Sequence, residues 1–485
     1  MATTSGRDEV HPPDRAVGAV TDLVDRRSAQ GRWILWAAVL GSGIAILDGT
    51  VVNIALRSIG ESLDASMSDL QWITNAYLLS LASLILLGGS LGDRFGRRRM
   101  YMIGIAWFAV ASGLCALAQT PDQLITARLL QGVGAALLTP GSLALIQASF
   151  RVEDRAAVIG KWAGLGGVAA AVGPLLGGWI IDNASWQWIF WINVPIAVVI
   201  LVISGRHVPE SRDPEAHGRF DLVGAALGAV GLAGTTYALI EMGVAEPWVV
   251  TLALVVGVLA LGAFIAYERL PRNPLVPLNL FQSRTFSFAN AMTFLVYGAL
   301  GAVLFILVLQ LQVVSGFSPL KAGLSTLPIT FAMLLLSSRS GALAVRIGPR
   351  LQMSVGPVIC AAGVLLLVPV GEGATFLLDV LPGMTVFSIG LACLVAPLTA
   401  SVLATAPDRL AGVASGINNA VARAGSLVAV AALPALVGLV GADYQDPQAL
   451  SDGYVRAQLV SAVLLVVGGV LCFVGLPREA PARGF

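Results

Sequence analysis

The chain has 485 residues, of which 56% are apolar and only 12% are charged, and its formal net charge is +1. Soluble globular proteins carry about 25% charged residues, so this composition excludes a disordered chain, an ordinary cytosolic enzyme and a protein that binds nucleic acid through a basic surface. Because a membrane-spanning helix needs about 20 apolar residues, the composition allows about a dozen spans or slightly more.

Fourteen apolar runs, taken in chain order, are long enough to span a bilayer. We therefore predict an all-α polytopic membrane protein whose two termini lie on the same side of the membrane. The runs cover residues 33–55, 70–91, 100–118, 123–148, 156–181, 188–204, 222–240, 248–267, 286–314, 320–344, 351–370, 376–402, 410–440 and 457–476.

The Lys and Arg residues fall almost entirely on one side of these spans. If the N-terminus is cytoplasmic, the inner segments hold 24 of the 29, and the outer loops hold only Arg57, Lys321 and Arg456. Cytoplasmic loops carry such an excess of Lys and Arg. We therefore predict a multi-pass protein of the inner (cytoplasmic) membrane with both termini in the cytoplasm.

A ten-residue pattern, G-x-L-x-x-R-x-G-x-R, occurs at residues 89–98 and again at 341–350. Two related halves are typical of transporters whose pathway lies between the halves. The copies are eight spans apart rather than six, so spans seven and eight are interpreted as an insertion. The predicted parts are a disordered cytoplasmic tail (1–32), a six-helix half (33–205), a linker (206–221), two additional helices (222–267), a second linker (268–285), a second six-helix half (286–476) and a cytoplasmic tail (477–485).

The sequence carries few groups that are typical of enzymes or cofactor sites. It has no Walker A pattern, because Gly160-Lys161 is followed by Trp162 and lacks the upstream glycine. The four cysteines are far apart in apolar runs and the three histidines lie in polar segments, so neither set has the spacing of a metal site. We expect no metal, no cofactor and no direct use of ATP.

Charged residues inside the spans are the strongest functional signal, because each costs a few kcal/mol in lipid and must face protein or water. Asp48 lies well inside the first span, close to Thr50 and Asn53, whereas Arg128 and Arg423 lie in the fourth and thirteenth. An aspartate is the simplest proton carrier, and a nearby arginine lowers its pKa. We assign proton coupling to Asp48 and Arg128. The alternative for Asp48 is a structural cap or a helix–helix hydrogen bond, and the alternative for Arg128 is a static clamp between helices. For Arg423 a structural and a functional role both stay open.

Two further motifs suggest moving parts. The loop after the second span can act as a cytoplasmic latch, in which Asp93 pairs with an arginine or caps the next helix; an exclusively topogenic role is the alternative. In the fifth span, Pro174 can kink the helix, and its neighbouring glycines allow close approach of another backbone, so we predict a hinge or tight seam, with simple packing as the alternative. The latch residues are Gly89, Asp93, Arg94, Gly96, Arg97 and Arg98, and the hinge residues are Gly173, Pro174, Gly177 and Gly178.

Together these motifs resemble the major facilitator superfamily, in its fourteen-span drug:proton antiporter branch. The resemblance runs from about residue 33 to residue 476, and loop 89–98 is similar to the superfamily's signature. It implies a fold of two six-helix halves plus two extra central helices, and a role in proton coupling for Arg128. Other stretches that resemble the branch are residues 47–56, 128–136, 173–178, 186–195 and 412–419.

The chain departs from the family pattern at several positions. Arg57 stands where a proline is usual, Ala169 replaces a glycine, and Val345 replaces an aspartate in the second copy of the loop. Spans ten and thirteen lack a central carboxylate. Since some exporters of cations in this branch carry acids there, a strictly cationic substrate is disfavoured, and Asp48 is left as the main buried proton site.

The sequence therefore predicts a proton-coupled antiporter that exports amphipathic drugs or antibiotics by alternating access. The expected partners are a small amphipathic organic substrate, protons and the lipid bilayer, with no nucleic acid; we expect a monomer without enzymatic activity, driven by a proton gradient. The alternatives are an exporter dedicated to one metabolite, siderophore, lipid or self-made antibiotic and, more remotely, a membrane sensor that does not transport. Candidate cavity residues are Thr50, Asn53, Gln131, Asn418 and Asn419.

Overall fold

The computed structural model describes residues 23–213, 221–270, 274–407 and 410–477. These residues contain 14 helices that are long and apolar enough to cross a membrane. The predicted all-α polytopic fold is thereby confirmed. Most of the two predicted tails, and residues 214–220 and 271–273 of the two predicted linkers, lie outside the described residues.

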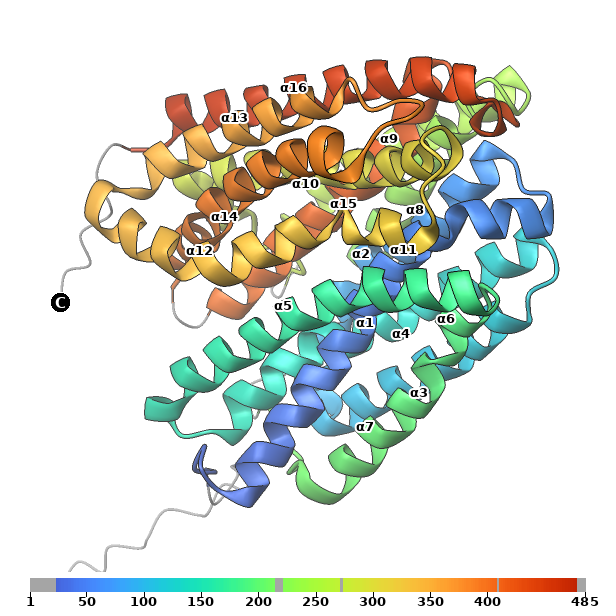
Figure 1. Cartoon of the computed structure of the whole chain (residues 1–485). Coiled ribbons are helices and arrows are strands. Elements are labelled where there is room, and N and C mark those ends of the chain that lie inside the picture. The colour runs from blue at the N-terminus through green and yellow to red at the C-terminus, as the bar shows by residue number, and fades with distance from the viewer. Residues whose placement is uncertain (1–22, 214–220, 271–273, 408–409, 478–485) are drawn as a thin grey trace, which may run out of the picture.

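The helices form two bundles with a helix pair beside them (Figure 1). We call the side on which α1 begins and α16 ends the proximal side, and the opposite side the distal side. The first bundle contains α1 (Ala29–Leu63), α2 (Met67–Phe95), α3 (Arg97–Leu117), α4 (Pro121–Ser149), α5 (Val152–Asn183), α6 (Trp188–Trp191) and α7 (Asn193–His207).

The second bundle contains α10 (Arg284–Val313), α11 (Pro319–Leu324), α12 (Leu327–Ile347), α13 (Pro349–Leu367), α14 (Leu381–Ala404), α15 (Ala411–Val437) and α16 (Pro447–Gly475). The helix pair, α8 (Leu222–Ile240) and α9 (Pro247–Tyr267), contacts the bundles through α8, which packs against both α2 and α15. Short 3-10 turns at Leu278–Gln282 and Asp443–Gln445 and a π-helical turn at Phe376–Val380 complete the second bundle.

The start of the chain differs from the prediction. The end of the segment that we expected to be a disordered tail is ordered, because Val24 is buried and pairs with Phe150 through the bond from the Val24 amide to the Ser149 carbonyl. The Ser28 hydroxyl then accepts a hydrogen bond from the Gly31 amide at 3.0 Å and caps α1. A cap of this kind starts a helix in polar sequence, so α1 begins before the apolar run does.

Several spans also differ in detail from the apolar runs. The sixth span is broken at Ile192 between α6 and α7, and the tenth is broken at Ser325 and Thr326 between α11 and α12. Arg57 and Arg456, which we placed in loops, lie on α1 and α16, respectively. Backbone hydrogen bonds of a helix continue into polar sequence, so these helices are longer than the apolar runs that cross the bilayer.

The repeated loop motif has the same backbone role in both bundles. Gly96 (φ 113°) separates α2 from α3, and Gly348 (φ 82°) separates α12 from α13. Side chains other than glycine rarely adopt these backbone angles. The second glycine of the G-x-L-x-x-R-x-G-x-R pattern is therefore the residue that lets the chain reverse direction.

The buried apolar residues form three clusters, and their distribution shows how the bundles meet. One cluster, on the distal side, is shared by both bundles and joins Val51 and Leu70 to Phe305 and Val430. Two separate clusters, one in each bundle, lie on the proximal side. Figure 1 shows the ribbons meeting on the distal side and separating toward the proximal side.

The hydrogen bonds that join the two bundles within the described residues are also distal. Gln312 donates to the Ile54 carbonyl at 2.9 Å, and Gln71 donates to the carbonyls of Val430 and Ala431, each at 2.8 Å. The Tyr444 hydroxyl donates to the Ala65 carbonyl at 2.8 Å. The structure is therefore sealed on the distal side.

A pair of buried carboxyl groups joins the proximal ends of α8 and α9. Asp221 accepts a hydrogen bond from the Gly224 amide at 2.7 Å, and Glu268 accepts one from the Val276 amide at 3.0 Å. The remaining oxygen of each carboxyl is buried without a hydrogen-bond donor among the described groups. Burial raises the pKa of Glu268 to about 7; the Asp221 carboxylate acts in the same direction, and the Val276 amide opposes it. A proton shared between the two acids satisfies both free oxygens.

We predict that Glu268→Gln stabilises the protein at neutral and alkaline pH. The pKa of Glu268 is higher in the folded protein than its usual 4.5, so the stability of the wild type falls as pH rises from about 4.5 to about 7 and stays low above it. Glutamine mimics the protonated acid and removes this loss. Thermal unfolding should show a gain in melting temperature that is small near pH 5 and largest near pH 8. The exposed Glu372→Gln is the control, and a gain that does not depend on pH would contradict the shared proton.

Candidate functional site

The first bundle holds an ion pair in its interior. Nη1 of Arg128 on α4 donates to Oδ2 of Asp48 on α1, and both side chains are 1% exposed. The structure thus brings together the two residues to which we assigned proton coupling. An ion pair with so little water around it is strongly held, because the effective dielectric constant is low.

Amide side chains complete the surroundings of the carboxylate. Gln131 Nε2 donates to Asp48 Oδ1 at 2.8 Å, and Asn193 Nδ2 donates to the same oxygen at 3.0 Å. Gln131 also accepts a hydrogen bond from Arg128 Nη1 at 2.6 Å. Each carboxylate oxygen of Asp48 therefore has a donor, which a buried charge requires. Gln131 is the one candidate cavity residue that contacts this pair.

The guanidinium group of Arg128 is held on its other sides as well. Its Nε donates to the Ile73 carbonyl at 3.1 Å. The Tyr77 ring lies 4.4 Å and the Phe190 ring 5.8 Å from the guanidinium carbon. Aromatic faces attract a cation, and more strongly where water is excluded. Arg128 is therefore fixed by α2 and α6 as well as by its acid on α1.

Close helix packing positions these groups. A Cβ atom on Gly132 would lie 2.0 Å from the Ser80 hydroxyl oxygen, and one on Gly134 would lie 2.7 Å from the Phe108 amide nitrogen. Only glycine lets α4 approach α2 and α3 so closely. These glycines therefore serve helix packing.

Asn193 reaches the site because the sixth span is interrupted. It is the first residue of α7, directly after the break at Ile192, and its Nδ2 also donates to the Ser112 hydroxyl at 3.0 Å. Ser112 in turn donates to the Phe190 carbonyl at 2.9 Å, in the turn just before the break. The polar residues therefore satisfy a carbonyl that the broken helix leaves free.

The remaining predicted residues of α1 and α5 lie at helix contacts instead. Thr50 donates to the Ile46 and Leu47 carbonyls of its own helix, at 3.1 and 2.9 Å, and packs against Gly173 of α5. Asn53 has no contact with Asp48 and leaves its Oδ1 buried without a partner.

The predicted hinge motif forms two contacts. A Cβ atom on Gly177 would lie 2.7 Å from Val51 Cγ1, so this part packs α5 against α1. A Cβ atom on Gly178 would lie 2.5 Å from Leu320 Cα, and one on Gly323 would lie 2.4 Å from the Pro174 carbonyl oxygen. This second contact is backbone against backbone between α5 and α11, which belong to different bundles. The motif forms a tight seam on the distal side.

Asp93 of the predicted latch contacts its own bundle in this structure. Asp93 forms an ion pair with Arg97 at 2.8 Å, and the Asp213 amide donates to the Asp93 carbonyl at 2.9 Å. The cap of α3 comes from Glu210, not from Asp93: its carboxylate accepts hydrogen bonds from the amides of Arg98 and Arg99 at 3.0 and 3.1 Å. An anion at a helix N-terminus is favourable. Gly96 lies against the Glu210 carboxylate, Arg94 stacks near Phe95, and Gly89 packs near Pro140.

The candidate residues on α15 form no hydrogen bond with Asp48 or Arg128 in the described structure. Asn418 donates to Asn290 Oδ1 at 3.1 Å and to the Thr293 hydroxyl at 2.9 Å, so it joins α15 to α10. Asn419 is exposed and donates to the Ser415 carbonyl of its own helix at 3.0 Å. Arg423 lies one turn further along α15, inside the span.

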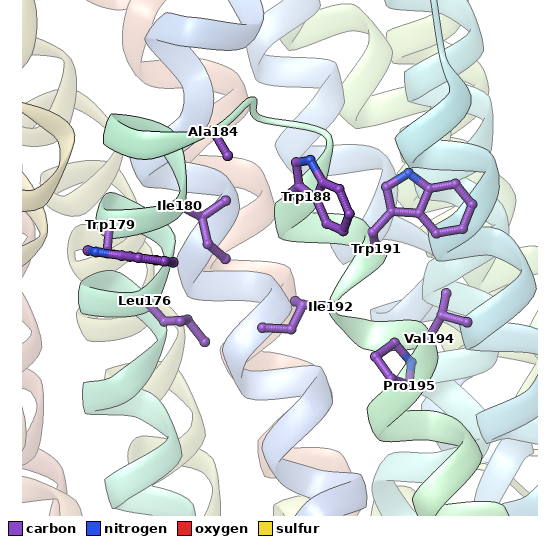
Figure 2. Close-up of a pocket in the computed structure, with 9 residues that line it drawn as sticks. All are labelled: Leu176, Trp179, Ile180, Ala184, Trp188, Trp191, Ile192, Val194 and Pro195. Atoms are coloured by element: carbon purple, nitrogen blue, oxygen red, sulfur yellow. The ribbon is translucent and has the colours of Figure 1, made fainter.

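An apolar groove of about 570 Å³ lies apart from these polar groups, near the distal ends of α5, α6 and α7. Figure 2 shows Ile180 and Leu176 on one side and Ile192 on the other, with three tryptophan rings around them. Trp179 and Trp188 are 55% and 56% exposed. Tryptophans collect where a membrane protein meets the headgroup region, so this groove belongs to the lipid-facing surface. Its lining residues are Leu176, Trp179, Ile180, Ala184, Trp188, Trp191, Ile192, Val194 and Pro195.

Comparison with known proteins identifies the family. The sequence profile of the Major Facilitator Superfamily matches residues 38–430. The chain belongs to the major facilitator superfamily. It is 36% identical to a methylenomycin A resistance protein of Bacillus subtilis (strain 168), over 86% of this chain and 90% of the relative. It is 34% identical to a tetracenomycin C resistance and export protein of Streptomyces glaucescens (83% and 75%), and 35% identical to a puromycin resistance protein of Streptomyces alboniger (92% and 90%).

Solved structures of the superfamily share the fold. A D-xylose-proton symporter matches with a TM-score of 0.65 at 16% identity, over 93% of this chain and 99% of the other. A bacterial homologue of the human lysosomal transporter Spinster, in an inward-facing and unoccupied conformation, matches with a TM-score of 0.66 at 16% identity, over 94% and 100%. The protein is a multi-pass membrane transporter of this superfamily, and its relatives are named for antibiotic resistance and export.

Sequence reasoning missed several residues that this superfamily member uses around its buried charges. Asn193 and Ser112 were given no role, although each is a polar residue inside an apolar run, which was the available signal. Glu210 was missed because its partners are backbone amides more than 100 residues away in sequence. No local spacing reveals such a contact.

We predict that Arg128→Met destabilises the protein and that adding Asp48→Asn recovers much of the loss. Removing one partner of a buried ion pair leaves an uncompensated charge and costs about 3–5 kcal/mol. In the double variant no charge remains buried, so the two substitutions should be strongly non-additive. Thermal unfolding of the purified protein, followed by tryptophan fluorescence, measures this coupling. The exposed Arg346→Met is the control, and additive effects would contradict a tightly coupled pair.

Proposed function

We propose that this transporter is a proton-coupled antiporter that exports amphipathic drugs or antibiotics across the cytoplasmic membrane by alternating access. The observation that carries the proposal is the buried Asp48–Arg128 pair inside the first bundle. Asp48 is the one acidic residue in the middle of a described span. A carboxylate at that depth is costly unless it has a function or a permanent partner.

The geometry suggests how Asp48 carries the proton. Its oxygens accept from Arg128, Gln131 and Asn193. A proton on Asp48 would remove the charge that holds Arg128 and turn one acceptor oxygen into a donor. The pair would then loosen, and α1 and α4 would be free to move relative to each other. Release of the proton would restore the pair, so protonation and conformation are coupled in both directions.

Alternating access requires the distal seal to open and a proximal seal to form. The distal seam between α5 and α11 consists mainly of small residues against backbone, as at Gly178 and Gly323. Opening it also breaks the hydrogen bond from the Leu320 amide to the Asp182 carboxylate, at 3.2 Å. On the proximal side, Asp93 of loop 89–98 forms an ion pair with Arg97 of its own bundle. That loop would be the latch of the opposite conformation, and the Gly173–Gly178 segment would act as the hinge.

The distribution of Lys and Arg supports the orientation. The proximal segments hold most of the 29 basic residues, and a cytoplasmic location of both termini follows from that excess. The proximal side is then the cytoplasmic side, and the structure corresponds to an inward-facing state. In this proposal the protein works as a monomer in the inner membrane, is driven by the proton gradient without a cofactor, and catalyses no chemical reaction.

A second candidate is an exporter that serves one compound. The relative from Streptomyces glaucescens is named for resistance to and export of tetracenomycin C alone. A susceptibility panel in a host without its own drug pumps separates the candidates. Resistance to several unrelated amphipathic compounds supports the multidrug exporter, and resistance to one supports the dedicated exporter.

We predict that Asp48→Asn lowers proton-driven transport at least about tenfold. Asparagine keeps the size of the side chain and one acceptor oxygen, but it cannot bind and release a proton. Everted membrane vesicles that express the protein should take up a labelled antibiotic to which it gives resistance, and uptake should collapse when the gradient is dissipated.

The exposed Asp122→Asn serves as the control, because it makes the same chemical change at the distal start of α4. Expression and thermal stability of both variants are measured in parallel. Transport by Asp48→Asn at the wild-type rate, still dependent on the gradient, would overturn the assignment of Asp48 as the proton carrier.

A further inference from the structure

Arg423 is a charged residue in the membrane that the mechanism above does not use. It lies in the middle of α15, within a membrane-spanning segment, and is only half-buried. No hydrogen bond or ion pair joins it to any other residue in the described parts of the chain. A guanidinium group at this depth must face water or a ligand, because leaving it in lipid costs several kcal/mol.

Arg423 lies at the junction of the two bundles. α15 packs against α2 of the first bundle and against α10 of its own bundle. The neighbouring Ser426 donates to the Tyr297 carbonyl at 2.8 Å, which fixes α15 against α10 at this level.

A polar stripe leads from the proximal side to Arg423. Ser415, Asn419 and Arg423 follow one another at intervals of four residues, so they lie on one face of α15. Asn419 is exposed although it lies inside the span. Asn418, on the adjacent face, is instead turned toward α10. Only one face of α15 is thus polar and open, and it is the face that ends at Arg423.

The charge balance at this junction favours an anion. The Asp48 carboxylate is already neutralised by Arg128, and the other acids on the described spans lie near helix ends. Arg423 is therefore an uncompensated positive charge in a region of low dielectric constant. A guanidinium group binds a carboxylate through two parallel hydrogen bonds, and such a pair gains strength where water is scarce.

We propose that Arg423 binds a carboxylate group of an amphipathic substrate at the junction of α15 with α2 and α10. The proposal rests on the proposed transport function and specifies its substrate class: organic acids rather than cations. In this proposal, the carboxylate of the substrate forms the ion pair that Arg423 lacks in the described structure.

The test is equilibrium binding to the purified full-length protein in lipid nanodiscs, with three labelled probes of one shape. The probes are 2-naphthylacetate (an anion), its methyl ester (neutral) and 2-(2-naphthyl)ethylammonium (a cation). The wild type should bind the anion at least about tenfold more tightly than the other two, which corresponds to about 1.4 kcal/mol. Arg423→Gln should abolish this preference and leave binding of the ester within about twofold.

Two further variants keep the proposal open to contradiction. Arg423→Lys retains the charge without the planar fork and should keep part of the preference for the anion. Arg456→Gln removes another arginine of the second bundle, which contacts the Val437 carbonyl on the distal side, and should change nothing. Equal binding of the three probes by the wild type, or a preference that survives in Arg423→Gln, would overturn the proposal.

Binding is measured without a proton gradient, so its outcome is separate from that of the transport test. Loss of the preference for the anion in Arg423→Gln, combined with vesicle uptake that ignores the gradient, would support the binding site and contradict antiport. A normal response to the gradient combined with no preference for the anion would do the reverse. Loss of gradient-driven uptake in Arg423→Gln with unchanged probe binding would mean that Arg423 belongs to the proton pathway and would contradict the substrate role.

Discussion

The structure is organised around one constraint, which is that a charge inside a bilayer needs a partner. Asp48 satisfies it through Arg128 and two amide side chains drawn from α4 and α7. Glycines allow α4 to pack closely against its neighbours. The interruption of the sixth span places Asn193 next to Asp48. Five helices thus meet at one ion pair, and none of them can move far without disturbing it. In the proposed mechanism, a proton bound at Asp48 would therefore act on the whole bundle.

The contacts between the two bundles differ from the contacts inside each bundle. Their shared apolar core and their connecting hydrogen bonds are distal, whereas each bundle keeps its own core on the proximal side. Many of the contacts between bundles use backbone carbonyls as acceptors, as with Gln71 and Gln312. Such bonds do not depend on a particular opposing side chain. A rocking motion can therefore exchange one set of contacts for another while each bundle remains intact.

Much of this could be predicted from the sequence, and the reasons for success and failure are physical. A backbone that crosses lipid must satisfy its own hydrogen bonds and therefore forms helices. The all-α fold of fourteen spans consequently follows from the order of apolar runs along the sequence. The pairing of Asp48 with Arg128 could be anticipated because opposite charges inside a membrane are stabilised when they form an ion pair. The ordered segment at Val24, the break at Ile192 and the cap supplied by Glu210 could not, because each depends on a tertiary contact. The sequence could not tell that Thr50 bonds to its own helix and Asn418 to α10, while Gln131 contacts Asp48, since being polar within a span does not determine which neighbour a side chain faces.

The helix pair α8 and α9 gives the molecule two unlike flanks. α8 packs against α2 of one bundle and α15 of the other, and Trp72 on α2 donates to Glu241 at the distal end of α8, at 2.8 Å. On the opposite flank, α5 meets α11 and α12, and no further helix of the described chain packs against both sides of that junction. If the proposed substrate enters from the bilayer, it meets a covered junction on one flank and an uncovered one on the other. The two extra helices would then make lateral access one-sided.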